Sequence, residues 1–180
     1  YIVTFPVPEG TEVKGAVLIC AGGAFQYRSD ANEGTPVAQA LEDIAVMGFS
    51  AGGILSGEML LHWDGLVNGS ALDPDYVPDA LVSVSADAAA CGMIYAFYGR
   101  LSVGTTDVEA LRAGDLPPTF YCYGTEDPFY RQFLANADAA EAAGVPVERL
   151  QLENTPHGFG VQGGWISQYD AWLSQSFDSN

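Results

Sequence analysis

The chain has 180 residues, 48% hydrophobic and 16% charged, which is enough for one globular domain with its own core and excludes a disordered chain. The formal net charge is −17, from 23 Asp and Glu against six Lys and Arg, so we expect neither a nucleic-acid partner nor a membrane surface. No apolar run approaches the roughly 18 residues that a membrane-spanning helix needs.

Short apolar runs alternate with helical patterns along the chain, which predicts a single α/β domain over residues 1–180 with a mostly parallel sheet and helices on both faces. The predicted strands cover residues 2–7, 15–20, 44–49, 92–98, 119–123 and 147–152. The predicted helices cover residues 34–41, 51–63, 129–143 and 163–175. Residues 64–90 are expected to be irregular apart from a short apolar piece at 81–84, and residues 99–117 form a loop with a helical turn.

The three cysteines indicate a reducing compartment. Cys20, Cys91 and Cys122 lie in separate apolar runs, and neither their odd number nor their spacing fits a disulfide framework or a zinc site. We therefore expect buried, reduced thiols in a cytoplasmic protein without a signal peptide.

The most informative motif is Gly48-Phe49-Ser50-Ala51-Gly52, which joins a predicted strand directly to a predicted helix. A serine nucleophile on a sharp strand-to-helix turn needs small residues two positions before and after it. The motif alone is weak because the chain holds 21 glycines, so an ordinary Gly-rich turn is the alternative. Its position between strand and helix favours Ser50 as a nucleophile.

A serine nucleophile needs a base, and the chain has two histidines. His62 lies three turns along the helix that follows Ser50, about 18 Å away, which is too far. His157 lies in a loop after the last predicted strand, where open α/β sheets place their chemistry. We predict His157 as the base, and a surface-loop histidine is the alternative.

The acid that orients the base is predicted to follow strand 119–123. Asp127 is preferred over Glu126 because Pro128 biases the residue before it toward extended backbone, and Glu126 is the reserve candidate. Asp127 as a helix cap is the alternative, and the two roles are compatible.

Backbone N–H groups should stabilise the oxyanion that forms when a serine attacks a carbonyl. One is the N–H of Ala51. Gly23 and Ala24, in the Gly-rich loop after strand 15–20, are predicted to supply the others, because backbone without bulky side chains approaches a ligand closely. A tight turn that binds nothing is the alternative.

Four segments in this order resemble the α/β-hydrolase superfamily, and more narrowly the bacterial esterase and lipase group that includes acetyl-esterase-like and acetylxylan-esterase-like enzymes. They are Leu18–Phe25, Gly48–Gly53, Gly124–Phe129 and Pro156–Phe159, and together they span most of the chain. The order Ser, Asp, His is that of the family.

Two departures from the family pattern stand out. The oxyanion loop usually carries a third glycine and a leading Pro or His, where this chain has Ala24 and Ala21. The family also has a longer segment before the elbow strand, with one further strand and its helices, whereas here Leu41 is followed almost at once by strand 44–49. Either the hydrolase fold is shortened or a segment is missing from the sequence. A shortened sheet would expose a strand edge beside residues 15–20, which would favour a homodimer formed by strand exchange.

The resemblance implies a serine carboxylic-ester hydrolase for short acyl esters, such as acetylated sugars or xylan fragments, working through an acyl-enzyme. No metal or organic cofactor is implied. Peptidase or thioesterase activity on the same residues, or a catalytically inactive binding module, are the alternatives. Four aromatic residues near the site loops are candidates to line a substrate pocket, each with plain core packing as its alternative: Phe25, Phe49, Phe129 and Phe159.

Overall fold

The computed structural model describes residues 17–27, 29, 32–33, 45–61, 75, 88–100 and 102–178. Four expectations fall outside these residues: the strand at 2–7, the helix at 34–41, the apolar piece at 81–84 and the position of His62.

The described part of the chain holds a five-stranded, fully parallel sheet in the order β1-β2-β3-β6-β7. Its strands are β1 Val17–Cys20, β2 Ala45–Phe49, β3 Cys91–Ile94, β6 Thr119–Gly124 and β7 Val147–Leu152. The central strands are buried along their whole length, which explains their continuous apolar sequences. Because all five run the same way, their carboxyl ends meet at one edge, and the loops that follow them lie together.

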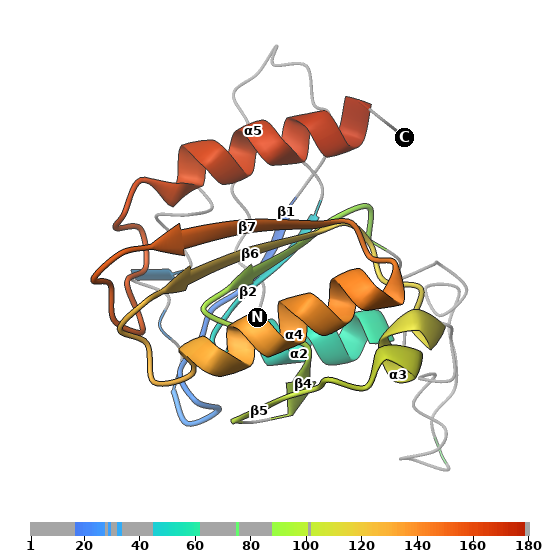
Figure 1. The fold of residues 1–180 in the computed structure, drawn as a ribbon. Helices are drawn as coiled ribbons and strands as arrows, with labels where there is room; N and C mark the ends of the chain where they lie inside the picture. The colour runs from blue at the N-terminus through green and yellow to red at the C-terminus, as the bar shows by residue number, and fades with distance from the viewer. Residues whose placement is uncertain are drawn as a thin grey trace.

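Helices cover both faces of this sheet (Figure 1). Helix α2, Ala51–Leu61, packs on β1, β2 and β3, and helix α4, Tyr130–Ala143, packs on β6 and β7 of the same face. Helix α5, Trp165–Asp178, covers the opposite face. The predicted α/β architecture, with helices on both faces of a mostly parallel sheet, is confirmed.

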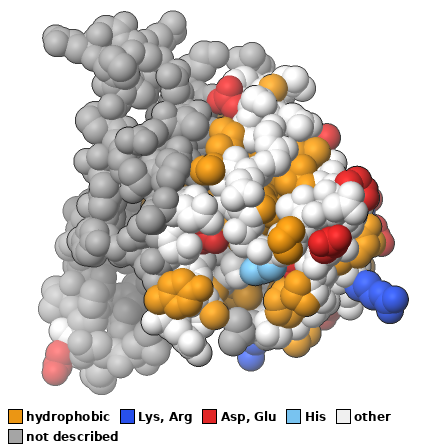
Figure 2. Space-filling model, turned by 90° about the vertical axis from the view of Figure 1, so that its left-hand side faces the viewer, with side chains coloured by type: hydrophobic (Ala, Val, Ile, Leu, Met, Phe, Trp, Pro, Cys, Tyr) orange, Lys and Arg blue, Asp and Glu red, His pale blue; other side chains and the backbone are white. Residues whose placement is uncertain are grey.

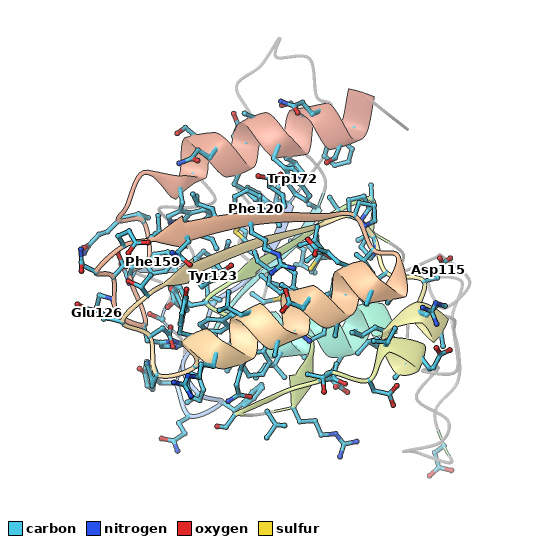
Figure 3. All side chains as sticks on the ribbon, in the orientation of Figure 1. Asp115, Phe120, Tyr123, Glu126, Phe159 and Trp172 are labelled. Carbon is cyan, nitrogen blue, oxygen red and sulfur yellow. The ribbon has the colours of Figure 1, made fainter. Side chains whose placement is uncertain are left out.

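Aromatic side chains fill the two layers between helices and sheet. On the α5 side, Phe120 of β6 lies against Trp172 with ring centroids 5.4 Å apart (Figure 3). On the α4 side, Tyr123 stacks on Phe133 at 5.7 Å. The alternation of these two strand residues between the faces follows from the two-residue period of a β-strand.

The strand predicted at 92–98 is shorter than expected. It ends at Ile94, because Tyr95 takes a left-handed backbone conformation with φ 38°. The chain then forms a small hairpin of β4, Gly99–Arg100, and β5, Val103–Gly104, followed by the short helix α3, Val108–Ala113. The predicted helical turn at 99–117 is α3, whereas the hairpin is not apparent from the sequence.

The predicted end of the helix at 129–143 is confirmed: Gly144 caps α4 in a left-handed conformation with φ 98°. The three cysteines are free, as predicted, but only Cys91 and Cys122 are buried. Cys20 is partly exposed because β1 stands at the end of the strand order within the described residues. On the same strand, Leu18 is 46% exposed. A homodimer formed at this edge stays a prediction.

Candidate active site

Ser50 sits on a sharp turn between β2 and α2, as the sequence motif predicts. Its backbone is left-handed, with φ 50°, a strained conformation for a side chain other than glycine. The turn is tight enough that a Cβ on Gly48 would collide with the backbone of Gly53, and a Cβ on Gly52 would collide with the carbonyl of Cys20. These glycines are required so that the elbow can pack against β1 with Ser50 at its tip.

His157 lies beside this serine, although 107 positions separate the two residues in the sequence. Its Nε2 is 2.9 Å from Ser50 Oγ. The imidazole is held edge-on between the rings of Tyr95, at 4.9 Å, and Phe129, at 5.8 Å. Among the described residues it is the only histidine, and its pale-blue atoms reach the surface between hydrophobic side chains in Figure 2. The side chain is 30% exposed, so a substrate can reach it.

Asp127 holds the other nitrogen of the ring. Its Oδ2 lies 2.6 Å from His157 Nδ1, and its side chain is fully buried. Its Oδ1 accepts a hydrogen bond from the Phe129 N–H at 2.8 Å, just before α4 begins. Asp127 therefore orients the histidine and also satisfies the backbone at the helix entry. The reserve candidate, Glu126, is exposed and does not contact the ring in any described interaction.

The loops that carry the acid and the histidine are joined by backbone contacts. Glu126 donates its N–H to the carbonyl of Thr155 at 3.1 Å, and Asn154 donates its N–H to Thr125 Oγ1 at 2.9 Å. Gly124, at the end of β6, has no room for a side chain because Thr155 lies against it. Gly158 has open space around it, so glycine is favoured there by its positive φ of 78° and not by close packing.

The Gly-rich loop after β1 lies against the elbow. A Cβ on Gly22 would be 3.0 Å from the Cβ of Ser50, which places this loop beside the nucleophile. Ala24 and Phe25 both have left-handed backbones, with φ 51° and 61°. Among the turn and loop hydrogen bonds of the described residues, none uses the N–H of Gly23, Ala24 or Ala51, the three groups predicted for an oxyanion hole.

A family model described as alpha/beta hydrolase fold matches residues 24–161. The chain belongs to this α/β-hydrolase family. A comparison with curated proteins gives no match.

Several solved structures share the fold of this hydrolase. An acetyl ester-xyloside bifunctional hydrolase from Caldicellulosiruptor lactoaceticus superposes with a TM-score of 0.64 at 16% identity, over 94% of this chain and 85% of that one. A propionate-bound thermophilic esterase from Thermogutta terrifontis gives 0.63 at 18% identity, over 94% and 85%. A fungal esterase from Rhizomucor miehei gives 0.64 at 15%, over 96% and 78%. The uncovered share of these structures agrees with a shortened fold.

The aromatic residues predicted to line a pocket take different positions in this hydrolase. Phe25 is 60% exposed on the Gly-rich loop after β1, and Phe129 is partly buried beside the histidine. Phe49 is fully buried against Tyr95 and Trp165, so its assignment to a substrate pocket is corrected to core packing beneath the site. Phe159 is 5% exposed and packs edge-on against Tyr95.

Two residues beneath the hydrolase site are absent from the sequence-based set: Glu33 and Tyr95. Glu33 is only 5% exposed, although it lies in a polar stretch that suggests a surface loop. Tyr95 lies within an apolar run, where nothing distinguishes it from core residues. An acidic residue shortly after the Gly-rich loop is the one signal in the sequence that points to Glu33.

The described residues contain no group of three or more His, Cys, Asp or Glu placed to hold a metal ion. In the same part of the chain, no helix has the length and apolar character needed to cross a membrane.

Proposed function

We propose that this chain is a serine carboxylic-ester hydrolase with Ser50, His157 and Asp127 as its catalytic triad. The observation that carries the proposal is the continuous hydrogen-bonded path from Ser50 Oγ to His157 Nε2, at 2.9 Å, and from His157 Nδ1 to Asp127 Oδ2, at 2.6 Å. The three side chains come from three separate loops and meet at the carboxyl edge of the sheet, with Ser50 on a strained turn. This is the arrangement that activates a serine.

The proposed reaction proceeds through an acyl-enzyme. Ser50 Oγ attacks the ester carbonyl while His157 Nε2 takes its proton, and the imidazolium then gives that proton to the leaving alcohol. His157 Nε2 then takes a proton from water as the water attacks the acyl carbon, and it returns that proton to Ser50 Oγ as the acid leaves. Asp127 fixes the tautomer in which Nδ1 carries the hydrogen, so Nε2 is free to accept.

The N–H groups of Ala51, Gly23 and Ala24 are proposed to stabilise the oxyanion. Ala51 is the first residue of α2, where backbone N–H groups have no partner within the helix and favour negative charge. The Gly-rich loop lies beside the elbow, so its N–H groups approach the same carbonyl from the other side.

Short acyl esters, such as acetylated sugars or xylan fragments, are the proposed substrates. Support comes from the names of structures with the same fold, which include an acetyl ester-xyloside hydrolase and an esterase with propionate or butyrate bound. The free, buried thiols Cys91 and Cys122 support a reducing, cytoplasmic environment. No observation favours a peptidase, a thioesterase or a binding module over an esterase.

The test compares p-nitrophenyl acetate hydrolysis by the purified chain with that of Ser50→Ala. Ser56→Ala is the matched control, because Ser56 is a buried serine in α2, the helix that follows Ser50, and its Oγ donates to the Gly52 carbonyl at 3.0 Å. We expect activity in the wild type and in Ser56→Ala, and at least a thousandfold loss in Ser50→Ala. A fluorophosphonate should label the wild type and not Ser50→Ala; equal background rates and no labelling of the wild type would reject the proposal.

A further inference from the structure

We propose that Glu33 is a positioning residue that, together with Tyr95, ties the oxyanion loop to the histidine loop and so sets the geometry of the oxyanion hole. This inference rests on the proposed ester hydrolysis and assigns a role to a residue pair outside the triad.

Glu33 is a buried carboxylate that binds two different parts of the site. One oxygen, Oε2, accepts a hydrogen bond from the Gly22 N–H at 2.6 Å. The other, Oε1, accepts one from the Tyr95 hydroxyl at 2.6 Å. Both distances are short, as expected for hydrogen bonds to an ionised acceptor in a dry environment. A buried acid so placed joins the loop after β1 to the loop after β3.

Tyr95 extends this connection to the histidine loop. Burial and the Glu33 carboxylate raise the pKa of the Tyr95 phenol well above its ordinary value. The phenol therefore stays protonated and donates its hydrogen to Glu33. The tyrosine ring also lies edge-on to His157 at 4.9 Å. One buried pair thus contacts both groups that must converge on the substrate carbonyl.

The residue before Glu33 adds a second link between the same two loops. The Asn32 side-chain amide lies 3.5 Å from the carbonyl of Gly158, and a Cβ on Gly160 would collide with the Asn32 side chain. The histidine loop is fixed from its other side by Trp165, whose indole N–H donates to the Gly160 carbonyl at 2.7 Å. The histidine loop therefore contacts Asn32 on one side and is fixed on the other by the buried Trp165 hydrogen bond.

The oxyanion loop needs such an anchor because its backbone is strained. Gly23, Ala24 and Phe25 have φ values of 134°, 51° and 61°, and the last two are unfavourable for residues with a Cβ. Strain of this kind persists only where surrounding contacts over-determine the conformation. The Gly22 N–H is used by Glu33, so it does not serve the substrate; its bond instead fixes where the next N–H groups point.

The experiment measures Glu33→Ala, Glu33→Gln and Tyr95→Phe against the wild type, with Glu148→Gln, an exposed acid on β7, as the control. The rate of p-nitrophenyl acetate hydrolysis is expressed per active site titrated with a fluorophosphonate. Inhibition constants for a trifluoromethyl ketone, which forms an oxyanion on the serine, and for the product acid are measured beside kcat and KM. Thermal melting reports on folding.

Loss of one oxyanion donor costs about 10²–10³ in kcat in serine hydrolysis, so we expect about a hundredfold fall in kcat for Glu33→Ala with KM unchanged. The inhibition constant of the trifluoromethyl ketone should rise by a similar factor, while that of the product acid stays constant. Glu33→Gln keeps one oxygen acceptor for the Gly22 N–H, so its kcat should be about tenfold higher than that of Glu33→Ala. Tyr95→Phe keeps the Gly22 bond and should lose about tenfold or less.

Two results would overturn the inference while leaving the proposed function in place. One is Glu33 variants with kcat per titrated site and trifluoromethyl ketone affinity within threefold of wild type, whatever their melting temperatures. The other is Glu33→Gln losing as much as Glu33→Ala. If Glu33→Ala does not fold, Glu33→Gln and Tyr95→Phe decide. A wild-type chain without Ser50-dependent hydrolysis rejects the proposed function itself, and the inference with it.

Discussion

Replacing Asp127 by asparagine should leave the fold intact and remove nearly all activity. The carboxylate makes two contacts: Oδ1 accepts from the Phe129 N–H at 2.8 Å, and Oδ2 faces His157 Nδ1 at 2.6 Å. An asparagine must turn its oxygen to the Phe129 N–H, since its NH₂ group would meet that N–H donor to donor. The NH₂ group then takes the place of Oδ2 and faces His157.

The consequence for the imidazole follows from this orientation. Facing an NH₂ donor, Nδ1 becomes the acceptor, so the hydrogen moves to Nε2, which then donates to Ser50 Oγ at 2.9 Å and cannot take its proton. Losses of about 10³–10⁴ in kcat, or about 4–5.5 kcal/mol in activation free energy, accompany a wrong tautomer of this kind. The free energy of unfolding should change by only about 1 kcal/mol, because the Phe129 hydrogen bond is retained.

The assay is kcat for p-nitrophenyl acetate, with urea unfolding as the measure of stability. Glu126→Gln is the matched control, since Glu126 is the neighbouring acid, is exposed and should keep activity within about twofold. Asp127→Asn activity within tenfold of the wild type would refute the tautomer argument. A large loss in Glu126→Gln, with Asp127→Asn active, would instead assign the orienting role to Glu126.

Three further predictions concern stability. Burial raises the pKa of the Cys91 thiol from 9.0 to about 12, so above pH 9 the unfolded chain releases a proton that the folded chain keeps. This thiol alone should lower the free energy of unfolding by about 1.4 kcal/mol per pH unit between pH 9 and 12, in addition to other buried groups such as Cys122, whose pKa burial also raises. Cys91→Ala should therefore make the slope in urea titrations shallower by that amount, and an unchanged slope would count against the shift. Asn136→Ala should lower the free energy of unfolding, measured in urea, by about 3 kcal/mol, because this buried amide makes four hydrogen bonds, two of them to the backbone of Tyr98. Gln168→Ala, at an exposed position, is its control, and equal stability of the two variants would contradict the prediction. Gly48→Ala should lower Tm and abolish esterase activity, because the added Cβ would collide with α2. The expected loss in the free energy of unfolding is about 2 kcal/mol or more. A Tm equal to that of the wild type would contradict the packing.

The sequence alone determined the sheet class, most element positions and three residues that the structure places together. Parallel strands buried on both faces leave continuous apolar runs, and the helices between them leave a 3.6-residue period, so both are visible locally. The chain has only two histidines, which limits the candidates for the base. A motif at a strand-to-helix junction then identified Ser50, and the residues after two later strands identified Asp127 and His157, since parallel strands bring their carboxyl ends to one edge.

Tertiary structure decided whatever depends on neighbours far apart in the sequence. Glu33 reads as a surface acid, and only the fold shows it buried between Gly22 and Tyr95. Only the fold shows that Asp127, and not Glu126, lies against the imidazole, which local stereochemistry favours but does not determine. From the sequence alone, Phe49 is equally consistent with lining a pocket and with packing in the core, and its burial follows from the rings that pack around it. In each case the deciding quantity is the distance to a group on another strand or loop, which no local pattern of residues encodes.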